Sequence, residues 1–223
     1  MTRIQLITTA DGSHSLLNAE LNETYHSVHG AIQESEHVFI KNGLSYWLEK
    51  PGRSDLRIFE IGFGTGLNVL LTMMETEKRG MQVYFESWET RPLEPAIAHA
   101  LNYPDRLGAT AWFRKIHDSA WNEPVALTPR FTLFKREADL LRDPMTQKDF
   151  DLVYYDAFAP SKQPDMWTQE VLQKVAAVMS SESVLVTYCA KGQVKRDLAS
   201  IGMKVETLQG PPGKKEMVRA GKG

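Results

Sequence analysis

Two stretches of this chain hold residues whose types and spacing can do chemistry, and the first is glycine-rich. Residues 62–68 read Gly-Phe-Gly-Thr-Gly-Leu-Asn and directly follow the apolar run 56–61, which contains Glu60. Closely spaced glycines let the backbone turn sharply and approach a ligand, and a helix that starts after them offers unpaired N–H groups. The pattern predicts a nucleotide-cofactor site between a strand and a helix.

The glycine spacing and Glu60 argue against a dinucleotide cofactor. A dinucleotide fingerprint has its third glycine three residues after the second, whereas Gly66 follows Gly64 by two residues and Leu67 fills the dinucleotide position. The Glu60 carboxylate would repel a pyrophosphate but attract the ammonium of a cofactor that carries an amino acid. The combination resembles the first motif of class I S-adenosylmethionine-dependent methyltransferases. The alternative is a turn that needs glycine only for its shape.

Two later acids fit the next motifs of those methyltransferases. Glu89 ends a second strand-like run, residues 82–89, where an acid can accept hydrogen bonds from ribose hydroxyls. Asp139 follows a third run, residues 131–136, and the resemblance implies that it accepts the adenine amino group. The alternatives are a solvated strand end for Glu89 and an N-cap for Asp139. The residues predicted to bind S-adenosylmethionine are Glu60, Gly62, Phe63, Gly64, Gly66, Asn68, Glu89, Asp139 and Asp156.

The second stretch is an acidic loop after a fourth strand-like run. Residues 150–155 lead into Asp-Ala-Phe-Ala-Pro-Ser-Lys-Gln-Pro-Asp-Met-Trp at 156–167. Because ligands of open α/β sheets bind at the carboxyl ends of strands, Asp156 is expected beside the cofactor. A carboxylate there can orient an amine and take its proton, so Asp156 is the predicted catalytic residue. The predicted substrate-binding residues of this loop are Phe158, Lys162 and Trp167. For both aromatic rings the alternative is a core position beneath the loop, which is the commoner fate of a tryptophan.

Together the two stretches resemble a named family. Residues 62–68 and 156–167 are similar to the methyltransferase part of the MnmC-type enzymes, which complete 5-methylaminomethyl-2-thiouridine at the tRNA wobble position. Further similar segments, which extend the resemblance over almost the whole chain, are residues 11–15, 23–27, 30–35, 38–40 and 213–217. One small departure is Ala157, where glycine is expected in the bifunctional members.

The resemblance implies methyl transfer from S-adenosylmethionine to the exocyclic amine of 5-aminomethyl-(2-thio)uridine in the tRNA anticodon loop. An alkyl amine with a pKa of about 10 is mostly protonated at neutral pH, so Asp156 would hold it and take or relay its proton. Bifunctional members also carry an FAD-dependent oxidoreductase domain. Because this chain ends at Gly223, we expect a stand-alone methyltransferase whose substrate comes from a separate oxidoreductase.

Two other functions stay open. The first is a small-molecule amine methyltransferase or aminopropyltransferase, and the second is a cofactor-binding interaction module without catalysis. The intact loop at Asp156 argues against the second, and the basic tail argues against the first.

Charge supports an RNA substrate only locally. The formal net charge is −2 and the pI is about 6.3, whereas nucleic-acid binders are usually basic. Residues 191–223, however, contain eight Lys and Arg against three Asp and Glu. A local basic patch can hold an anticodon stem through its phosphates, so Lys214 and Lys215 are predicted to bind tRNA. The alternative is ordinary solvated surface.

Alternating strand and helix patterns predict an α/β fold of the Rossmann-like class I methyltransferase type. We expect a mostly parallel seven-stranded sheet with helices on both faces, and by resemblance an antiparallel last strand. Further strands are expected at 184–188, 204–208 and 216–220, and helices at 67–79, 94–101 and 169–179, with a helical excursion at 103–128. Residues 1–55 are expected to form an N-terminal extension that packs on the methyltransferase domain, residues 56–223.

Composition favours a cytoplasmic enzyme without a metal. A chain of 223 residues with 42% hydrophobic content can bury a full core. Apolar runs fall short of the roughly 18 residues of a membrane helix, and the start lacks the apolar stretch of a signal peptide. Cys189, the single cysteine, lies in an apolar run and is expected in the core. The histidines show no ligand-like grouping stronger than His26-x-x-His29.

Overall fold

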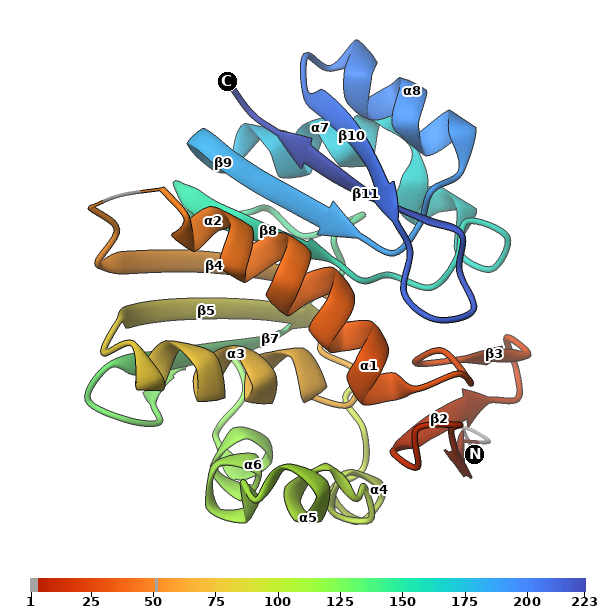
Figure 1. The fold of residues 1–223 in the computed structure, drawn as a ribbon, viewed down its shortest axis with the longest axis vertical. Helices are drawn as coiled ribbons and strands as arrows, with labels where there is room; N and C mark the ends of the chain where they lie inside the picture. Colours follow the sequence, from red (N-terminus) through yellow and green to blue (C-terminus); the bar gives the residue numbers. More distant parts are fainter. Residues whose placement is uncertain (1–3, 51) are drawn as a thin grey trace.

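An eight-stranded sheet forms the centre of the computed structural model, which describes residues 4–50 and 52–223 (Figure 1). The strand order is β10-β11-β9-β8-β4-β5-β7-β6. The bounds are β4 (Asp55–Ile61), β5 (Gln82–Glu89), β6 (Pro124–Ala126), β7 (Phe131–Glu137), β8 (Phe150–Tyr155), β9 (Met179–Thr187), β10 (Lys204–Gln209) and β11 (Glu216–Gly221). Strands β9, β8, β4, β5 and β7 are parallel, whereas β11, β10 and β6 pair antiparallel.

The sheet confirms the expected type and corrects the expected number of strands. The antiparallel last strand, β11, is as the resemblance implied. The eighth strand is β6, which lies inside the stretch expected to be helical and pairs with β7. Three residues are too few for a recognisable period-2 pattern, so the sequence predicted only the helices of that stretch.

Helices cover both faces of the sheet, as expected. On one face α1 (Ala31–Ser35), the π-helix η1 (Glu36–Ser45) and α2 (Tyr46–Leu48) run as one continuous helical stretch beside α3 (Leu67–Lys78) (Figure 1). The other face is covered by α7 (Gln169–Ala177) and α8 (Gly192–Ser200). The remaining helices are α4 (Pro95–His99), α5 (Tyr103–Leu107), α6 (Thr110–Asp118) and the 3-10 turn η2 (Pro164–Trp167). Among the described residues, no helix is long and apolar enough to cross a membrane.

Neighbouring residues of the central strands enter two different cores. Ile58 packs with the helices of the first face and Phe59 with those of the second, because successive side chains of a strand point to opposite faces. Gly43 of η1 lies directly on the sheet, where an added Cβ would be 2.9 Å from Val186 Cγ2. The glycine therefore lets η1 approach β9 closely.

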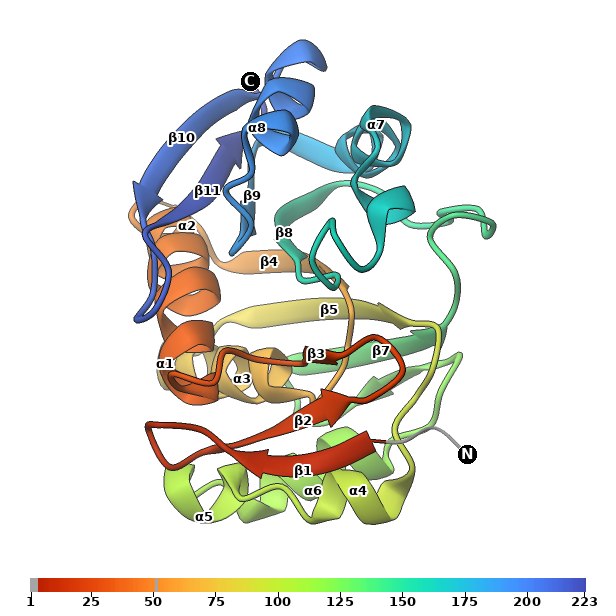
Figure 2. The same ribbon diagram turned by 90° about the vertical axis from the view of Figure 1, so that its right-hand side faces the viewer.

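The N-terminal residues reach both the face and the carboxyl edge of the sheet. Strands β1 (Ile4–Thr8), β2 (His14–Asn18) and β3 (Glu23–Thr24) form a separate antiparallel sheet, which lies in front of the carboxyl edge in Figure 2. Farther along, Phe39, Leu44 and Trp47 are buried in the core of the first face. The segment therefore belongs to the same packed body as the sheet.

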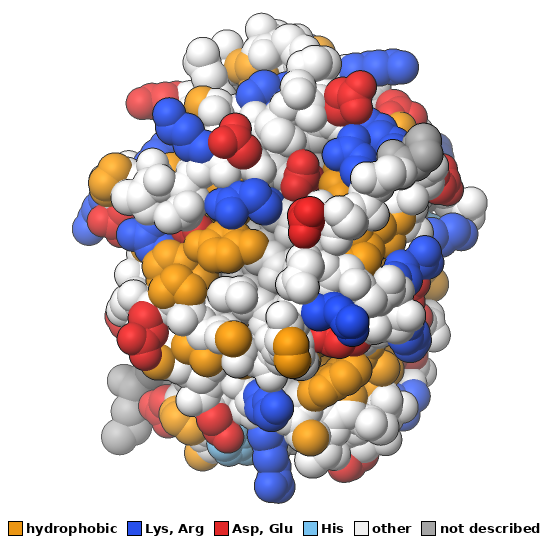
Figure 3. Space-filling view, turned by 90° about the vertical axis from the view of Figure 1, so that its left-hand side faces the viewer, with side chains coloured by type: hydrophobic (Ala, Val, Ile, Leu, Met, Phe, Trp, Pro, Cys, Tyr) orange, Lys and Arg blue, Asp and Glu red, His pale blue; other side chains and the backbone are white. Residues whose placement is uncertain are grey.

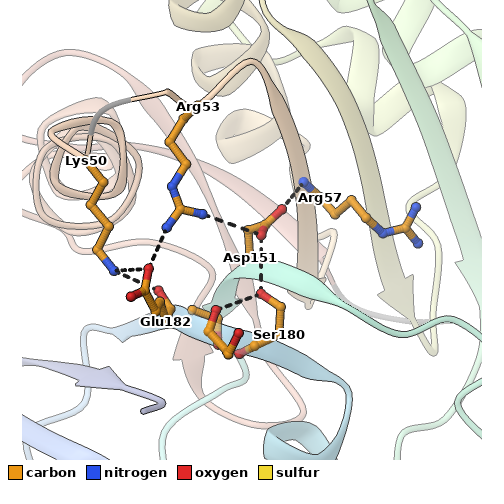
Figure 4. Close-up of polar contacts among 8 residues, drawn as sticks. Lys50, Arg53, Arg57, Asp151, Ser180 and Glu182 are labelled. Carbon is orange, nitrogen blue, oxygen red and sulfur yellow. Dashed lines mark hydrogen bonds and ion pairs between the residues drawn. The ribbon is translucent and has the colours of Figure 1, made fainter.

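At the opposite edge, where the parallel strands begin, ion pairs fasten the end of this segment to the sheet (Figure 4). Arg53 lies 3.3 Å from Glu182 Oε2 and 3.9 Å from Asp151 Oδ1. Asp151 Oδ2 also accepts the N–H of Arg57 at 2.9 Å, and Ser180 donates to Asp151 Oδ1 at 3.2 Å. These contacts join β4, β8 and β9. The surface on this side mixes acidic, basic and small apolar groups (Figure 3).

Candidate cofactor and acceptor site

A cavity of about 730 Å³ opens at the carboxyl edge of the sheet. This volume is in the range of small-molecule and cofactor sites. Its wall is made by the ends of β4, β5, β7, β8 and β9, by the turn between β10 and β11, and by the segment around β3. The lining segments are residues 61–65, 67–68, 88–91, 138–142, 156–158, 162–166, 188, 213–214, 23–29, 18, 21 and 34.

The glycine turn has the backbone that its composition predicts. Gly62, Gly64 and Gly66 have φ of +93°, +49° and +70°, a region that side chains with a Cβ rarely adopt. A Cβ on Gly62 would lie 2.8 Å from the backbone oxygen of Asp156. Gly62 thus allows the glycine turn and the acidic loop to meet. Phe63 lines the cavity but is buried, and its ring packs edge-on against Trp121.

A buried network underneath this meeting point ends in two unpartnered oxygen atoms. Ser87 donates to Glu60 Oε2 at 2.6 Å, and the Asn68 amide donates to Asp156 Oδ2 at 2.9 Å. Glu60 Oε1 and Asn68 Oδ1 are buried without a partner among the described residues. Because unpaired buried acceptors are costly, these atoms fit a ligand that brings a donor. The ammonium of an amino-acid-bearing cofactor is such a donor.

The carboxyl groups of this network favour their uncharged forms. Burial raises the pKa of Glu60 to about 8, partly offset by the hydrogen bond from Ser87. Burial also raises the pKa of Asp156 well above its ordinary value, and the charges of Glu34 and Glu60 raise it further. The amide of Asn68 acts in the opposite direction. A cation bound here would therefore favour loss of a proton from either carboxyl.

Glu89 and Asp139 both line the cavity, and each also supports local backbone. Glu89 Oε2 accepts the N–H of Gly64 at 3.1 Å, so the acid after β5 braces the glycine turn. Asp139 Oδ1 accepts the N–H of Leu141 at 2.9 Å within a turn, and helix α7 begins only much later. Asp139 is therefore not a helix N-cap. The ribose contact of Glu89 and the adenine contact of Asp139 remain predictions.

The predicted substrate-binding residues of the acidic loop lie in two different places, the cavity wall and the core. Phe158 and Lys162 line the cavity, and the Phe158 ring meets the ring of Tyr25 edge-to-face at 5.1 Å. Trp167 is only 5% exposed and is not part of the lining. Its indole N–H donates to the backbone oxygen of Phe158 at 2.8 Å. Trp167 thus supports the loop from beneath, which is the alternative that the sequence left open, because a large ring gains most by burial. Its substrate contact remains a prediction.

The two tail lysines have different surroundings. Lys214 lines the cavity, and its Nζ lies 2.6 Å from Glu34 Oε1. Lys215 is exposed and outside the lining. The phosphate contacts of both lysines remain predictions, and the exposed Lys215 is better placed for one than Lys214, which already pairs with Glu34.

The segment before α1 supplies site residues to which the sequence assigned no role. Tyr25 covers the glycine turn, since its Cδ1 would lie 3.2 Å from a Cβ on Gly64. His26 Nε2 lies 2.7 Å from Thr65 Oγ1, and burial lowers the pKa of His26 to about 4, so the ring is neutral at pH 7. The only signal was the family resemblance of residues 23–27, because a polar loop has no periodicity to interpret.

Cys189 is 5% exposed within the core of the second face, which confirms the predicted packing role. Across residues 4–50 and 52–223, no group of three or more His, Cys, Asp or Glu could hold a metal ion.

Comparison with known families and proteins gives consistent matches. The family described as S-adenosyl-L-methionine-dependent methyltransferase matches residues 135–223. The tRNA 5-methylaminomethyl-2-thiouridine biosynthesis bifunctional protein MnmC of Idiomarina loihiensis is 30% identical over 91% of this chain and 36% of its own length. The protein of the same name from Ralstonia nicotianae is 31% identical over 91% of this chain and 32% of its own length. The chain thus spans about a third of these relatives.

A solved structure supports the same assignment. The crystal structure of MnmC2 from Aquifex aeolicus superposes with a TM-score of 0.78 at 25% identity, covering 99% of this chain and 70% of that one. The shared fold is the Rossmann-like class I type, and the buried acceptors beside the glycine turn fit the amino group of S-adenosylmethionine. The chain is an MnmC methyltransferase-like protein.

Proposed function

We propose that this protein transfers the methyl group of S-adenosylmethionine to the exocyclic amine of 5-aminomethyl-(2-thio)uridine at the tRNA wobble position. The observation that carries the proposal is Asp156, a carboxyl of raised pKa in the cavity wall, held by Asn68 next to the glycine turn. The names of the MnmC relatives support the tRNA nucleoside as substrate.

The chain's own residues divide the work between binding and proton transfer. Asn68 in the cavity wall and Glu60, buried behind it, would offer their unpartnered oxygens to the cofactor's amino group. Glu89 and Asp139, which also line the cavity, would face its nucleoside part. Bound S-adenosylmethionine supplies an electrophilic methyl group. Asp156 must lose its own proton before it can act as a base, and a cation bound in the site favours that loss. Because Asn68 occupies Asp156 Oδ2, the other oxygen, Oδ1, would then receive a proton from the acceptor ammonium. The neutral nitrogen then needs only positioning to react.

The acceptor base enters from the open side of the same cavity. Phe158 and Lys162, both in the wall, would contact the base and a nearby phosphate. Enzymes that modify one base of an RNA loop commonly splay it out and stack it on an aromatic ring, and Phe158 is the ring that this loop offers.

The proposed acceptor requires an earlier step that exposes an amine. We place an FAD-dependent oxidoreductase activity there, which removes a carboxymethyl group, on the same or on a separate polypeptide. The word bifunctional in the names of the MnmC relatives supports such a pairing of activities. The reaction would take place in the cytoplasm, where tRNA is modified.

A substrate survey tests the proposal. The protein is incubated with methyl-labelled S-adenosylmethionine and, separately, with tRNA that carries 5-aminomethyl-2-thiouridine, with polyamines and with amino acids. We expect label in tRNA alone, at the wobble nucleoside after digestion. Label in polyamines would instead establish a small-molecule amine transferase, and cofactor binding without transfer to any pool would leave a non-catalytic binding module.

A further inference from the structure

An ion pair between two distant parts of the chain forms one wall of the cavity. Glu34 lies on α1, and Lys214 lies in the turn between β10 and β11, which hangs beside α1 in Figure 1. Lys214 Nζ is 2.6 Å from Glu34 Oε1, and Glu34 Oε2 accepts the N–H of Ser27 at 2.7 Å. The Glu34 side chain is only 7% exposed. Its charge is thus little screened by water and depends on Lys214 for compensation.

Tyr188, just after β9, connects this pair to the proposed proton acceptor. Lys214 Nζ lies 3.8 Å from the centre of the Tyr188 ring. The Tyr188 hydroxyl donates to the backbone oxygen of Ala157 at 2.8 Å, one residue from Asp156. Glu34, Lys214, Tyr188 and Asp156 all line the cavity. The ion pair and the catalytic carboxyl are therefore parts of one wall.

The balance of charge in this wall matters because the acceptor nitrogen must be neutral when it reacts. A nearby carboxylate raises the pKa of an amine, and a nearby ammonium lowers it. With Glu34 unpaired, two carboxylates would face the amine and hold its proton too strongly. With Lys214 unpaired, the wall would repel the cationic amine before it binds.

We propose that Lys214 cancels the charge of Glu34 beside the acceptor amine. The pKa of that amine is then controlled by Asp156 and not by Glu34. The proposal rests on the amine acceptor of the proposed function. Neither residue of the pair takes the proton or contacts the methyl group, so both are positioning residues. The sequence suggested phosphate binding for Lys214; its contacts suggest this electrostatic role.

Other titratable groups face the pair from the surrounding elements. His26 and His29 lie in the segment before α1, Cys189 follows β9, and Tyr188 and Asp156 share the cavity wall with the pair. Any test over a range of pH must separate the acceptor amine from these groups. Two cofactor analogues that differ only at the atom where the methyl group is transferred serve this purpose, because every effect that does not depend on charge at that atom cancels in their affinity ratio.

The test compares the affinities of sinefungin and S-adenosylhomocysteine by calorimetry from about pH 6 to about pH 10. Sinefungin carries an amine where S-adenosylmethionine carries its methyl group, so the affinity ratio reports protonation at the transfer point. We expect Lys214→Met to move the midpoint of this ratio to higher pH, and Glu34→Gln to lower pH, each by about one unit. The double variant, which lacks both charges, should return close to the parent.

Lys204→Met is the matched control, because Lys204 lies exposed on β10 of the same hairpin, outside the cavity lining. It loses the same charge and should leave the midpoint in place. Thermal unfolding confirms that each variant is folded. Equal shifts in Lys214→Met and Lys204→Met, shifts of one direction in both single variants, or a parent ratio without pH dependence would overturn the proposal. If the shifts appear but tRNA is not methylated, the tRNA substrate alone is rejected.

Discussion

Asp156 is suited to exchange a proton with an amine because its surroundings favour the uncharged carboxyl. An exposed aspartate has a pKa far below that of an amine, which makes it a weak base. Burial, together with Glu34 and Glu60, brings the pKa of Asp156 upward, toward that of its proposed partner. The hydrogen bond from Asn68 fixes one oxygen atom and so directs the other.

Asp156→Asn should keep the fold and the cofactor site but lose most methyl transfer. Asparagine keeps the size and one acceptor oxygen, yet it cannot take a proton, and general-base catalysis contributes about 10²–10⁴-fold. Single-turnover rates on 5-aminomethyl-uridine tRNA, with calorimetry of S-adenosylhomocysteine as the control for binding, measure the loss. The variant should recover in part at high pH. A rate within about threefold of the parent at neutral pH would reduce Asp156 to a binding residue.

Glu60 makes the stability of the ligand-free protein depend on pH. Its pKa rises on folding from the ordinary value of 4.5 to about 8, so the folded state retains a proton that the unfolded state has released. The unfolding free energy should therefore fall as pH rises between about 4.5 and about 8. Asp156 adds a fall of the same sign.

Urea unfolding at several pH values in this window measures the slope. Glu60→Gln, which cannot ionise, should have a smaller slope than the parent, and saturating S-adenosylhomocysteine should reduce the parent's slope because its ammonium pairs with ionised Glu60. Equal slopes in the parent and in Glu60→Gln would show that the carboxyl is not held protonated.

At the scale of elements, the sequence predicts which residues lie at the ends of the parallel strands. It does not predict which residues of the N-terminal segment and of the β10–β11 turn pack against them. Glu60, Glu89, Asp139 and Asp156 were found because each lies at or near the carboxyl end of a strand, and such ends share one edge. The pairing of Glu34 with Lys214 spans 180 residues, and no local pattern encodes it. The covering role of Tyr25 depends likewise on how the N-terminal segment packs.

Gly62→Ala should weaken cofactor binding, because its added Cβ causes a steric clash as well as backbone strain. Gly62 has a φ of +93°, and its added Cβ would lie 2.8 Å from the Asp156 backbone oxygen. Gly108, with a φ of +63° and nothing within 4 Å, has similar strain without the contact. The strained backbone alone should cost each alanine variant about 1–2 kcal/mol of stability, and the contact with Asp156 should add to the loss in Gly62→Ala.

The difference between the two glycines should appear in ligand binding. We expect only Gly62→Ala to weaken S-adenosylhomocysteine, by tenfold or more, corresponding to about 1.4 kcal/mol, since the acidic loop must shift. Calorimetry on both variants decides the matter. Equal affinities would mean that the loop absorbs the extra carbon without moving the site.

For the molecule as a whole, the net charge of −2 means that the proposed tRNA binding would depend on local surfaces. The side that Figure 3 views, where the parallel strands begin, alternates in charge and offers no uniform basic field. Residues 191–223 carry an excess of basic residues. Three of these bases form ion pairs, namely Lys195 with Glu216, Arg219 with Glu206, and Lys214 with Glu34. Of the two lysines predicted to bind tRNA phosphates, Lys215 is exposed next to the cavity wall and is the better candidate.

Lys215→Ala should therefore lower the salt dependence of tRNA binding, whereas Lys214→Ala should leave it nearly unchanged. Each phosphate contact contributes a slope of about 0.7–0.9 to the plot of log affinity against log salt. Losing one contact at Lys215 should reduce the slope by that amount, while Lys214, already paired with Glu34, releases no counterion on binding. Titrations of tRNA at several salt concentrations give both slopes. If Lys214→Ala lowers the slope and Lys215→Ala does not, the ion pair opens on RNA binding and the phosphate contact belongs to the cavity wall.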